Sequence, residues 1–399
     1  MPHQKRVTSS RETGALVRDA AMLDSVIPAD EVTEAKHDEL ARLLEPHRGE
    51  RHVIVLQSFP DPDAISSALA HAMICERFDI VCDIAYDGMV SHHENVALVE
   101  LLNIPLVRIC GSNGNDTDLT RYQGSVFVDN QGTTSGLTDR LTQSNVPVFA
   151  IVDHHELQNI ITAEFTDIRN ANATATIYTE YLQAGLLPLE TGNPEHERLA
   201  TALMHGIRSE TGGLARADRD DFLATAYLAE YVDEETLDAI LTVERSRKSM
   251  DAIKTALDAR VVHDNYSIAG VGYVRYEDRD AIPQAADFLL TEENVHTAIV
   301  YGIVRKPGER EIIIGSMRTR KATLNPDAFL KDALGGAEKG RYYGGGRREA
   351  GGFEIPVGFL AGVHDEEFMR HKWLLYDEQI KRKIWTKIGV QDARQATDE

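Results

Sequence analysis

The sequence has few cysteines, and none of them is spaced like a metal-binding or redox motif. Only three occur in 399 residues, at Cys75, Cys82 and Cys110. No CxxC pair is present, and all three lie in apolar or strand-like surroundings. We therefore expect buried thiols in a reducing compartment, and neither a disulfide framework nor a thiolate metal site.

Long hydrophobic runs are also missing. The N-terminal segment MPHQKRVTSSRETGALVRDAAML lacks the apolar core of a signal peptide. No apolar run approaches the ~20 residues that a membrane-spanning helix needs. The sequence therefore predicts a cytoplasmic protein.

Basic residues are outnumbered by acidic ones. The chain has 42 Lys and Arg against 64 Asp and Glu, a formal net charge of −22. This balance argues against a protein that coats long nucleic acid through a basic surface, but it does not exclude a small anionic substrate. Between residues 305 and 348 there are 11 Lys or Arg and 5 Asp or Glu, a local charge of +6 that leaves −28 for the rest. A basic island in so acidic a chain predicts an anion pocket.

The length suits two domains with short extensions. Apolar runs of strand length alternate with helical patterns in the first part, which predicts a mostly parallel, doubly wound α/β sheet. After about residue 260, strand-like and helical patterns predict a second, smaller α+β domain. The expected division is an N-terminal arm and helix at 1–48, a first domain at 49–243, a linker helix at 244–260, a second domain at 261–361 and a C-terminal helix at 362–399.

Acidic and histidine residues follow three of the predicted strands. They are Asp61 and Asp63, Asp129, and the run Asp153, His154 and His155. An isolated acid at a helix start is more often a cap, and an isolated histidine pair more often a solvated loop. Ligands bind beyond the carboxyl ends of strands in such sheets, so three successive strand ends of this kind indicate a metal site. Carboxylates and imidazole without thiolate favour Mn²⁺ or Mg²⁺.

Several short motifs resemble a known family. DPDA, FVDN, VDHH and HGIRSETGG, in this order, resemble the four motifs of the DHH phosphoesterase superfamily. GSMRTR followed by GGGRREAGG resembles its associated C-terminal substrate-binding domain. The most similar branch contains bacterial oligoribonuclease/3′-phosphoadenosine-5′-phosphate phosphatases and cyclic-di-AMP phosphodiesterases. The resemblance covers about residues 50 to 361 and implies a catalytic first domain.

The resemblance implies a two-metal site with defined roles. Asp61 would bind a first Mn²⁺, Asp63 and His154 a second, and Asp129 both. His155 would hydrogen-bond the scissile phosphate, and Asp153 would orient the histidine pair. The acid that ends the fourth motif, Glu210, would complete the second site. Two cations at such a site activate water and offset phosphoryl charge.

The sequence departs from the family pattern at three positions. Gln57 stands where the family usually has a histidine ligand of the first metal, and Glu210 where it has aspartate. Arg347 stands where the glycine loop usually has histidine. These differences leave three readings open: a weakly bound first metal, a different ion, or a slow enzyme. Glu210 reaches one methylene further than aspartate and could partly offset Gln57.

Substrate binding is expected in the second domain. Glycine lets a backbone approach an anion closely, and the resemblance implies that the glycine loop and a nearby arginine hold the substrate opposite the metals. The residues expected there are Arg318, Arg320, Gly344, Gly345, Gly346 and Arg347.

Two further clusters have simpler explanations. His92 and His93 could touch the cleft, but a surface helix capped by Ser91 explains them as well, and we prefer the cap. Tyr342 and Tyr343 could stack a base, yet packing beside a glycine turn is common.

The sequence thus predicts a metal-dependent phosphoesterase acting on short oligonucleotides, linear or cyclic dinucleotides, or 3′-phosphoadenosine 5′-phosphate. We expect Mn²⁺ or Mg²⁺ as cofactor, a small phosphorylated nucleotide as partner, no long nucleic acid or membrane, and a homodimer. One alternative is a pyrophosphatase or exopolyphosphatase, which shares the N-terminal motifs. Another is a nucleotide-binding regulator with an impaired metal site.

Overall fold

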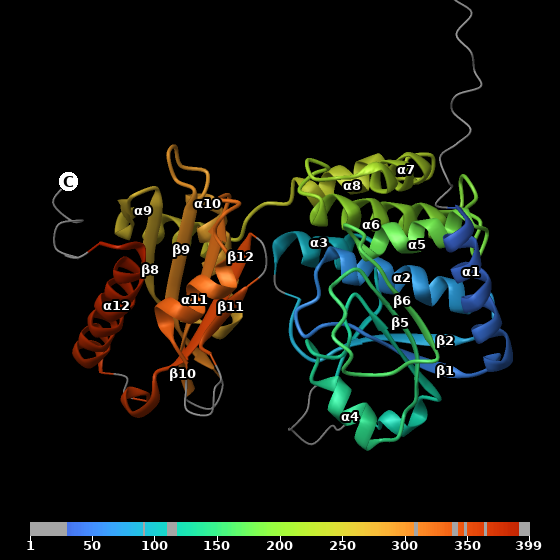
Figure 1. Cartoon of the computed structure of the whole chain (residues 1–399), viewed down its shortest axis with the longest axis horizontal. Coiled ribbons are helices and arrows are strands. Elements are labelled where there is room, and N and C mark those ends of the chain that lie inside the picture. Colours follow the sequence, from blue (N-terminus) through green and yellow to red (C-terminus); the bar gives the residue numbers. More distant parts are fainter. Residues whose placement is uncertain are drawn as a thin grey trace, which may run out of the picture.

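The protein is described here by a computed structural model that covers residues 30–90, 92–109, 118–306, 310–336, 342–346, 349–362 and 365–390. These residues form two domains, each built on a six-stranded sheet (Figure 1). Within these ranges, no helix combines the length and the apolar character that crossing a membrane requires.

The sheet of the first domain is entirely parallel, as predicted. Its strand order is β3-β2-β1-β4-β5-β6, so the direction of winding reverses between β1 and β4. The carboxyl ends of strands at such a switch point border a crevice where ligands bind. The strands are β1 (Arg51–Val55), β2 (Val81–Tyr86), β3 (Leu106–Arg108), β4 (Gly124–Val128), β5 (Val148–Asp153) and β6 (Phe165–Ile168).

Successive residues of a strand point to opposite sides of the sheet. Both faces of this sheet carry buried apolar side chains, and helices cover both faces. Ile54 and Leu56 enter the larger core, while Val53 and Val55 enter a second core with Leu137 on the other face. The larger core is built by α1 (Asp30–Leu44), α2 (Pro62–Glu76), α3 (His93–Leu101), α5 (Thr174–Gln183), α6 (Pro194–Glu210), α7 (Arg219–Leu228) and α8 (Glu234–Leu241), and the smaller one by α4 (Leu137–Gln143).

The second domain is a mixed sheet between two pairs of helices. Its strand order is β11-β12-β10-β9-β8-β7, with β8 and β9 parallel and the other pairs antiparallel. The strands are β7 (Val261–His263), β8 (Tyr266–Arg275), β9 (Thr297–Lys306), β10 (Arg310–Thr319), β11 (Gly344–Gly346) and β12 (Ala350–Pro356). On one face lie α11 (Pro326–Leu334) and α12 (Glu366–Ile388), and on the other α9 (Arg247–Ala259) and α10 (Ala281–Leu289).

The expected linker helix at 244–260 overlaps α9, which does not bridge the domains. Ile253 and Ala256 on α9 are buried in the core of the second sheet. The helical stretch between residues 234 and 260 is broken, because α8 ends at Leu241 and Ser246 begins α9 by accepting a hydrogen bond from the Ser249 amide (3.1 Å).

Candidate metal centre

Asp61 and Asp63 lie where the chain passes from β1 into α2. Asp61 is the N-cap of α2, and its Oδ1 accepts a hydrogen bond from the Ala64 amide (3.0 Å). Pro62 occupies the first turn, where its missing N–H costs nothing. The cap therefore holds both carboxylates at the carboxyl end of β1, at the switch point of the sheet.

Asp63 is completely buried and is bound by the start of another helix. The amides of Thr174 and Ala175, at the N-terminus of α5, donate to its two carboxylate oxygens (2.8 and 2.7 Å). The positive end of the α5 dipole and these two amides stabilise a negative charge. They also fix both oxygens in one orientation, as a metal ligand requires.

Asp129 follows β4 in a left-handed backbone conformation, with a φ of 57°. Aspartate tolerates this conformation better than most residues. The turn aims the carboxylate at the same crevice, where the Thr174 hydroxyl donates to Asp129 Oδ1 (2.9 Å). Thr174 thus contacts both Asp63 and Asp129.

His154 presents one ring nitrogen to these carboxylates. Its Nδ1 lies 3.1 Å from the Ala171 carbonyl, so it carries the proton and donates to that oxygen. The unprotonated Nε2 then faces Asp129 Oδ1 at 3.4 Å and Asp63 Oδ2 at 3.7 Å. A second-shell hydrogen bond of this kind orients histidine ligands in metal sites.

His155 is oriented by Asp153. Its Nδ1 lies 2.7 Å from Asp153 Oδ1, and Gln131 donates to the other oxygen of Asp153 (2.7 Å). Burial acts to raise the pKa of Asp153, but the hydrogen bonds from His155 and Gln131 outweigh it and hold that pKa below its usual value. His155 Nε2 has no hydrogen-bond partner within the described part of the chain. It is therefore available to a ligand.

The electrostatics of the crevice favour a cation. Burial, followed by the charge of Asp61, raises the pKa of Asp63 to about 7. Burial, followed by the charges of Asp63 and Asp61, raises the pKa of Asp129 well above its usual value. Burial and the neighbouring His155 lower the pKa of His154, which keeps its ring neutral. Buried carboxylates and a neutral imidazole with its lone pair facing them fit a divalent metal ion.

Gln57 and Glu210 border the same carboxylates. The Gln57 amide donates to Asp61 Oδ2 (2.8 Å), so its carbonyl oxygen is the atom left for a metal. Glu210 is the last residue of α6, and its charge acts on both Asp129 and His154. Both residues lie at the expected place, and their assignment as ligands remains a prediction.

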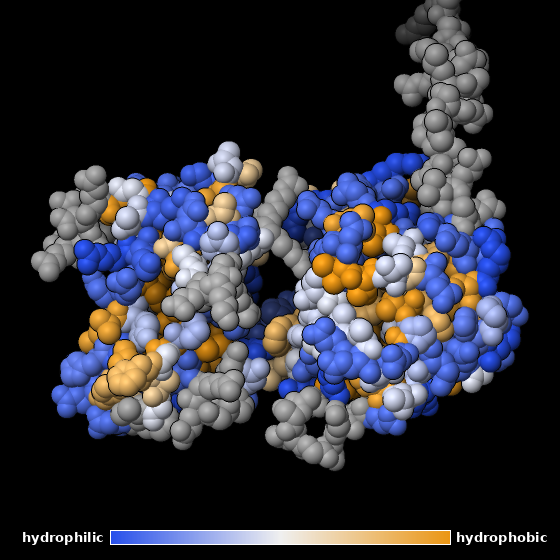
Figure 2. Space-filling view, turned by 60° about the horizontal axis from the view of Figure 1, so that its bottom comes forward, coloured by the Kyte–Doolittle hydropathy of each residue, from blue (hydrophilic) through white to orange (hydrophobic). Residues whose placement is uncertain are grey.

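Two cavities lie between the domains, where Figure 2 shows a hollow. The larger, about 720 Å³, has His155 on one wall and Gly346 on the other. The smaller, about 170 Å³, has Pro60 on one wall and Arg318 on the other. The two domains therefore face each other across the candidate centre.

The predicted substrate-binding residues do not form one cluster. Arg318 pairs with Asp287 (2.7 Å) at the smaller cavity, whereas Arg320 is exposed and lines neither cavity. Gly344, Gly345 and Gly346 form strand β11, and the Gly346 amide donates to Asp327 (3.3 Å). Arg347 lies outside the described residues, as does Ser91.

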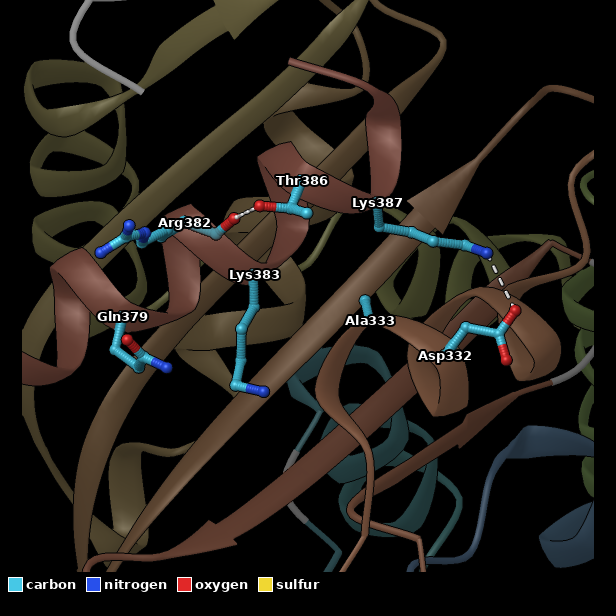
Figure 3. Close-up of a pocket in the computed structure, with 7 residues that line it drawn as sticks. All are labelled: Asp332, Ala333, Gln379, Arg382, Lys383, Thr386 and Lys387. Carbon is cyan, nitrogen blue, oxygen red and sulfur yellow. Dashed lines mark hydrogen bonds and ion pairs between the residues drawn. The ribbon is translucent and has the colours of Figure 1, made fainter. Parts of the chain in front are cut away.

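A further cavity of about 610 Å³ lies within the second domain, between α11 and α12 (Figure 3). Lys387 closes one end through an ion pair with Asp332 (2.8 Å). Arg382 and Lys383 on its wall are exposed. None of the predicted site residues lines it, so it is separate from the metal centre.

Comparison with known proteins agrees with this arrangement. Residues 51–207 match the DHH family, N-terminal domain. The match covers most of the first domain, so this domain is similar to those of the DHH family. The match includes the strand ends that carry Asp61, Asp63, Asp129, Asp153 and the histidine pair.

The chain is also similar to an uncharacterized protein of Methanocaldococcus jannaschii, 37% identical over 336 residues. The match spans 84% of this chain but only 63% of that protein. A crystal structure of an exopolyphosphatase-related protein from Bacteroides fragilis aligns with a TM-score of 0.62 at 15% identity, over 87% of this chain and 98% of that one. It establishes that the two-domain fold is shared.

A structure of the exonuclease RecJ bound to manganese also aligns, with a TM-score of 0.44 at 15% identity, over 86% of this chain and 94% of that one.

Sequence reasoning missed the residues that hold the ligands in place. Thr174 and Ala175 bind Asp63 from α5, and Gln131 binds Asp153. The pattern NATATIYTE marks a helix start, whose free amides are anion-binding groups. That signal does not say which carboxylate the amides meet, because the partner lies 111 residues away along the chain.

Proposed function

We propose that this chain is a metal-dependent phosphoesterase of the DHH superfamily. Its proposed substrates are short oligonucleotides, linear or cyclic dinucleotides, or 3′-phosphoadenosine 5′-phosphate. The observation that carries the proposal is the convergence of Asp63, Asp129 and His154, whose facing atoms lie 3.4–3.7 Å apart in a buried crevice between two domains. Mn²⁺ is the proposed ion, and Mg²⁺ is the alternative.

The chain's own residues divide the work in this proposal. Asp61, Asp63, Asp129, His154 and Glu210 would hold the ions. Divalent cations bound there supply activated water and charge neutralisation at a phosphoryl group.

His155 would contact a phosphoryl oxygen through Nε2 while Asp153 holds its other nitrogen, which fixes the ring toward the larger cavity. Such an oriented donor stabilises developing charge without reorganisation.

Short substrates fit the cleft better than polymers do. The larger cavity, about 720 Å³, has the size of a typical small-molecule site, and the smaller one, about 170 Å³, has room for only part of such a molecule. We also propose a homodimer that acts in the cytoplasm. Sedimentation of the full chain tests the first of these, and a monomer would contradict it.

The deciding experiment is hydrolysis of the dinucleotide pApA with and without Mn²⁺. We expect Mn²⁺-dependent turnover that falls by roughly a thousandfold or more in Asp129→Ala, because that variant removes a buried carboxylate that would hold the ions. Asp238→Ala, an exposed acid on α8, is the matched control and should retain full activity.

Gln57→His tests the glutamine directly. We expect it to lower the Mn²⁺ concentration needed for half-maximal rate, because imidazole binds transition metals better than an amide does. Turnover that needs no metal, or survives Asp129→Ala, would refute the proposed metal-dependent mechanism.

One observation favours a regulator as the second candidate. The Gln57 side-chain amide donates a hydrogen bond to Asp61 Oδ2, and the first metal would otherwise bind this carboxylate. If the wild type binds pApA tightly but hydrolyses it only after Gln57→His, the regulator is the better account.

A further inference from the structure

The smaller cavity between the domains combines apolar walls with a polar rim. Its walls include four apolar side chains, those of Phe59, Pro60, Met89 and Pro283. The Phe59 side chain is 52% exposed although it is large and aromatic. An aromatic ring left open in a cleft is a stacking surface for nucleobases.

The Phe59 ring is held in place by its neighbours. The Arg279 guanidinium lies over it at 4.1 Å from the ring centroid and over Tyr276 at 4.6 Å. Arg279 is 8% exposed, so the stack is fixed in the cleft wall. A ring already immobilised loses little conformational entropy when a ligand stacks on it.

The backbone beside Phe59 is braced as well. The Ser58 amide donates to the Thr134 carbonyl (2.9 Å), and the Ser58 hydroxyl donates to Asp87 (2.6 Å). The Met89 amide donates to the Ser58 carbonyl (2.9 Å), which ties two walls of the cavity together. The wall of the first domain is therefore preformed.

The polar rim of the cavity accepts hydrogen bonds more than it donates them. Asp287 already pairs with Arg318 (2.7 Å). The half-buried Asp280 carboxylate makes no hydrogen bond within the described ranges, and it does not cap α10. Asn95 uses its N–H to bind the Pro60 carbonyl (3.1 Å), which leaves its oxygen. Two carboxylates against one arginine disfavour a phosphate here and favour a ring that carries amino groups.

His92 is also part of the polar rim of this cavity. It is the residue before α3, its side chain makes no capping hydrogen bond, and it lines the cavity. His92 therefore touches the cleft, while the expected cap, Ser91, lies outside the described residues.

The cavity also has the right position for the proposed substrate. Pro60 on its wall directly precedes Asp61 of the metal centre. A nucleotide with its phosphate at the centre can therefore place its base beside Pro60. The larger cavity, on the His155 side, leaves room for the other part of the molecule.

We infer that the cavity formed by Phe59, Pro60, Met89, Pro283 and Asp280 is a nucleobase subsite that prefers bases with an exocyclic amino group. The inference rests on the proposed function and narrows it, because inorganic polyphosphate has nothing to place there. Phe59 supplies the stacking surface, and Asp280 accepts from the amino group.

Binding measurements separate the base from the phosphate. Titration calorimetry on the full chain with Mn²⁺ compares adenosine 5′-monophosphate with ribose 5-phosphate, which lacks only the base. We expect the nucleotide to bind roughly 5- to 150-fold more tightly, the range for one stacked base. Phe59→Ala should remove most of that ratio, whereas Phe222→Ala, an equally exposed phenylalanine on α7, should keep it.

Asp280→Asn tests the amino-group preference. The wild type should prefer adenosine 5′-monophosphate over uridine 5′-monophosphate by about tenfold, because a carboxylate repels the uracil carbonyl and accepts from the adenine amine. An amide can serve both bases, so the variant should bind them nearly equally.

The outcomes distinguish this inference from the proposed function. Equal binding of adenosine 5′-monophosphate and ribose 5-phosphate, or equal weakening of both by Phe59→Ala, would overturn the base subsite even if pApA is hydrolysed. Base-dependent binding that Phe59→Ala abolishes would uphold the subsite even if no hydrolysis occurs. No binding of either ligand together with no hydrolysis would overturn both.

Discussion

At the scale of single residues, the centre gathers more negative charge than a metal-free protein can easily hold. Asp129 is 2% exposed, and Asp63, Asp61, Asp153 and Glu210 all act to raise its pKa. Within the described residues, Asp129 forms ion pairs with His154 and His155 alone, and burial lowers the pKa of His154. The metal-free protein therefore carries unfavourable electrostatic energy at this point, which a cation would relieve.

Asp129→Asn should make the metal-free protein more stable and insensitive to metal. Asparagine keeps the shape, tolerates the left-handed backbone and still accepts from Thr174, but it carries no charge. We expect the metal-free Tm to rise by about 2–4 °C for each kcal/mol of repulsion removed. The rise in Tm on adding Mn²⁺ should largely disappear.

Differential scanning calorimetry with EDTA and with Mn²⁺ measures both effects. Asp238→Asn, on the exposed face of α8, should leave both quantities as in the wild type. A lower metal-free Tm together with an unchanged Mn²⁺ response would show that Asp129 is a structural residue.

At the scale of elements, the position of α2 depends on how closely α6 approaches it. A Cβ on Gly206 of α6 would lie 2.3 Å from the Ser66 hydroxyl and 3.2 Å from the Pro62 carbonyl. Both atoms belong to the first turns of α2, which carry Asp63. The glycine thus costs helix propensity but lets α2 sit where its carboxylates reach the centre.

Gly206→Ala should therefore destabilise the protein although alanine favours helices. Overpacking of this kind costs about 1–3 kcal/mol, more than the gain in helix propensity of about 0.5–1 kcal/mol. The shift of α2 should also weaken Mn²⁺ binding, as measured by calorimetry.

The double variant Ser66→Ala/Gly206→Ala provides the control. It removes the hydroxyl that the new methyl group meets, so most of the lost stability should return, and urea unfolding of the four-member cycle measures the coupling. A Gly206→Ala protein as stable as the wild type would show that α6 and α2 can separate without cost.

The same elements show what a sequence can predict about this site. The runs before Asp61, Asp129 and Asp153 predict buried parallel strands, and the strand order places their ends together. The closeness of Gly206 to Ser66 and the binding of Asp63 by Thr174 could not be predicted, because both join segments more than 100 residues apart. The short edge strand β6 (Phe165–Ile168) was missed as well, since four residues carry too little periodicity.

At the scale of the whole molecule, one ion pair among the described residues joins the domains across the cleft. Arg216 pairs with Glu349 across it at 3.2 Å, and both side chains are about half exposed. An exposed pair of this kind contributes about 0–1 kcal/mol. The stacking of Arg279 on Phe59 adds a second contact between the domains. The ion pair therefore contributes little to holding the domains together.

Charge at this scale predicts how rate depends on substrate length. The segment 305–348 carries +6 and the remainder −28, so a short substrate stays near the basic island while a longer one extends over acidic surface. In the phosphoesterase proposal we expect kcat/KM at 50 mM salt to fall steadily from dinucleotides to oligonucleotides of about ten residues.

Raising the salt concentration should reduce this dependence on length. The Debye length is about 8 Å at 0.15 M and about 3 Å at 1 M, so salt screens the distant acidic surface more than contacts inside the cleft. The ratio of kcat/KM for pApA to that for a ten-residue oligoadenylate, measured between 50 mM and 0.5 M salt, should therefore decrease. A ratio that increases with salt, or a long substrate cleaved as fast as pApA at 50 mM, would mean that the chain binds polymers through a basic path, as a processive nuclease does.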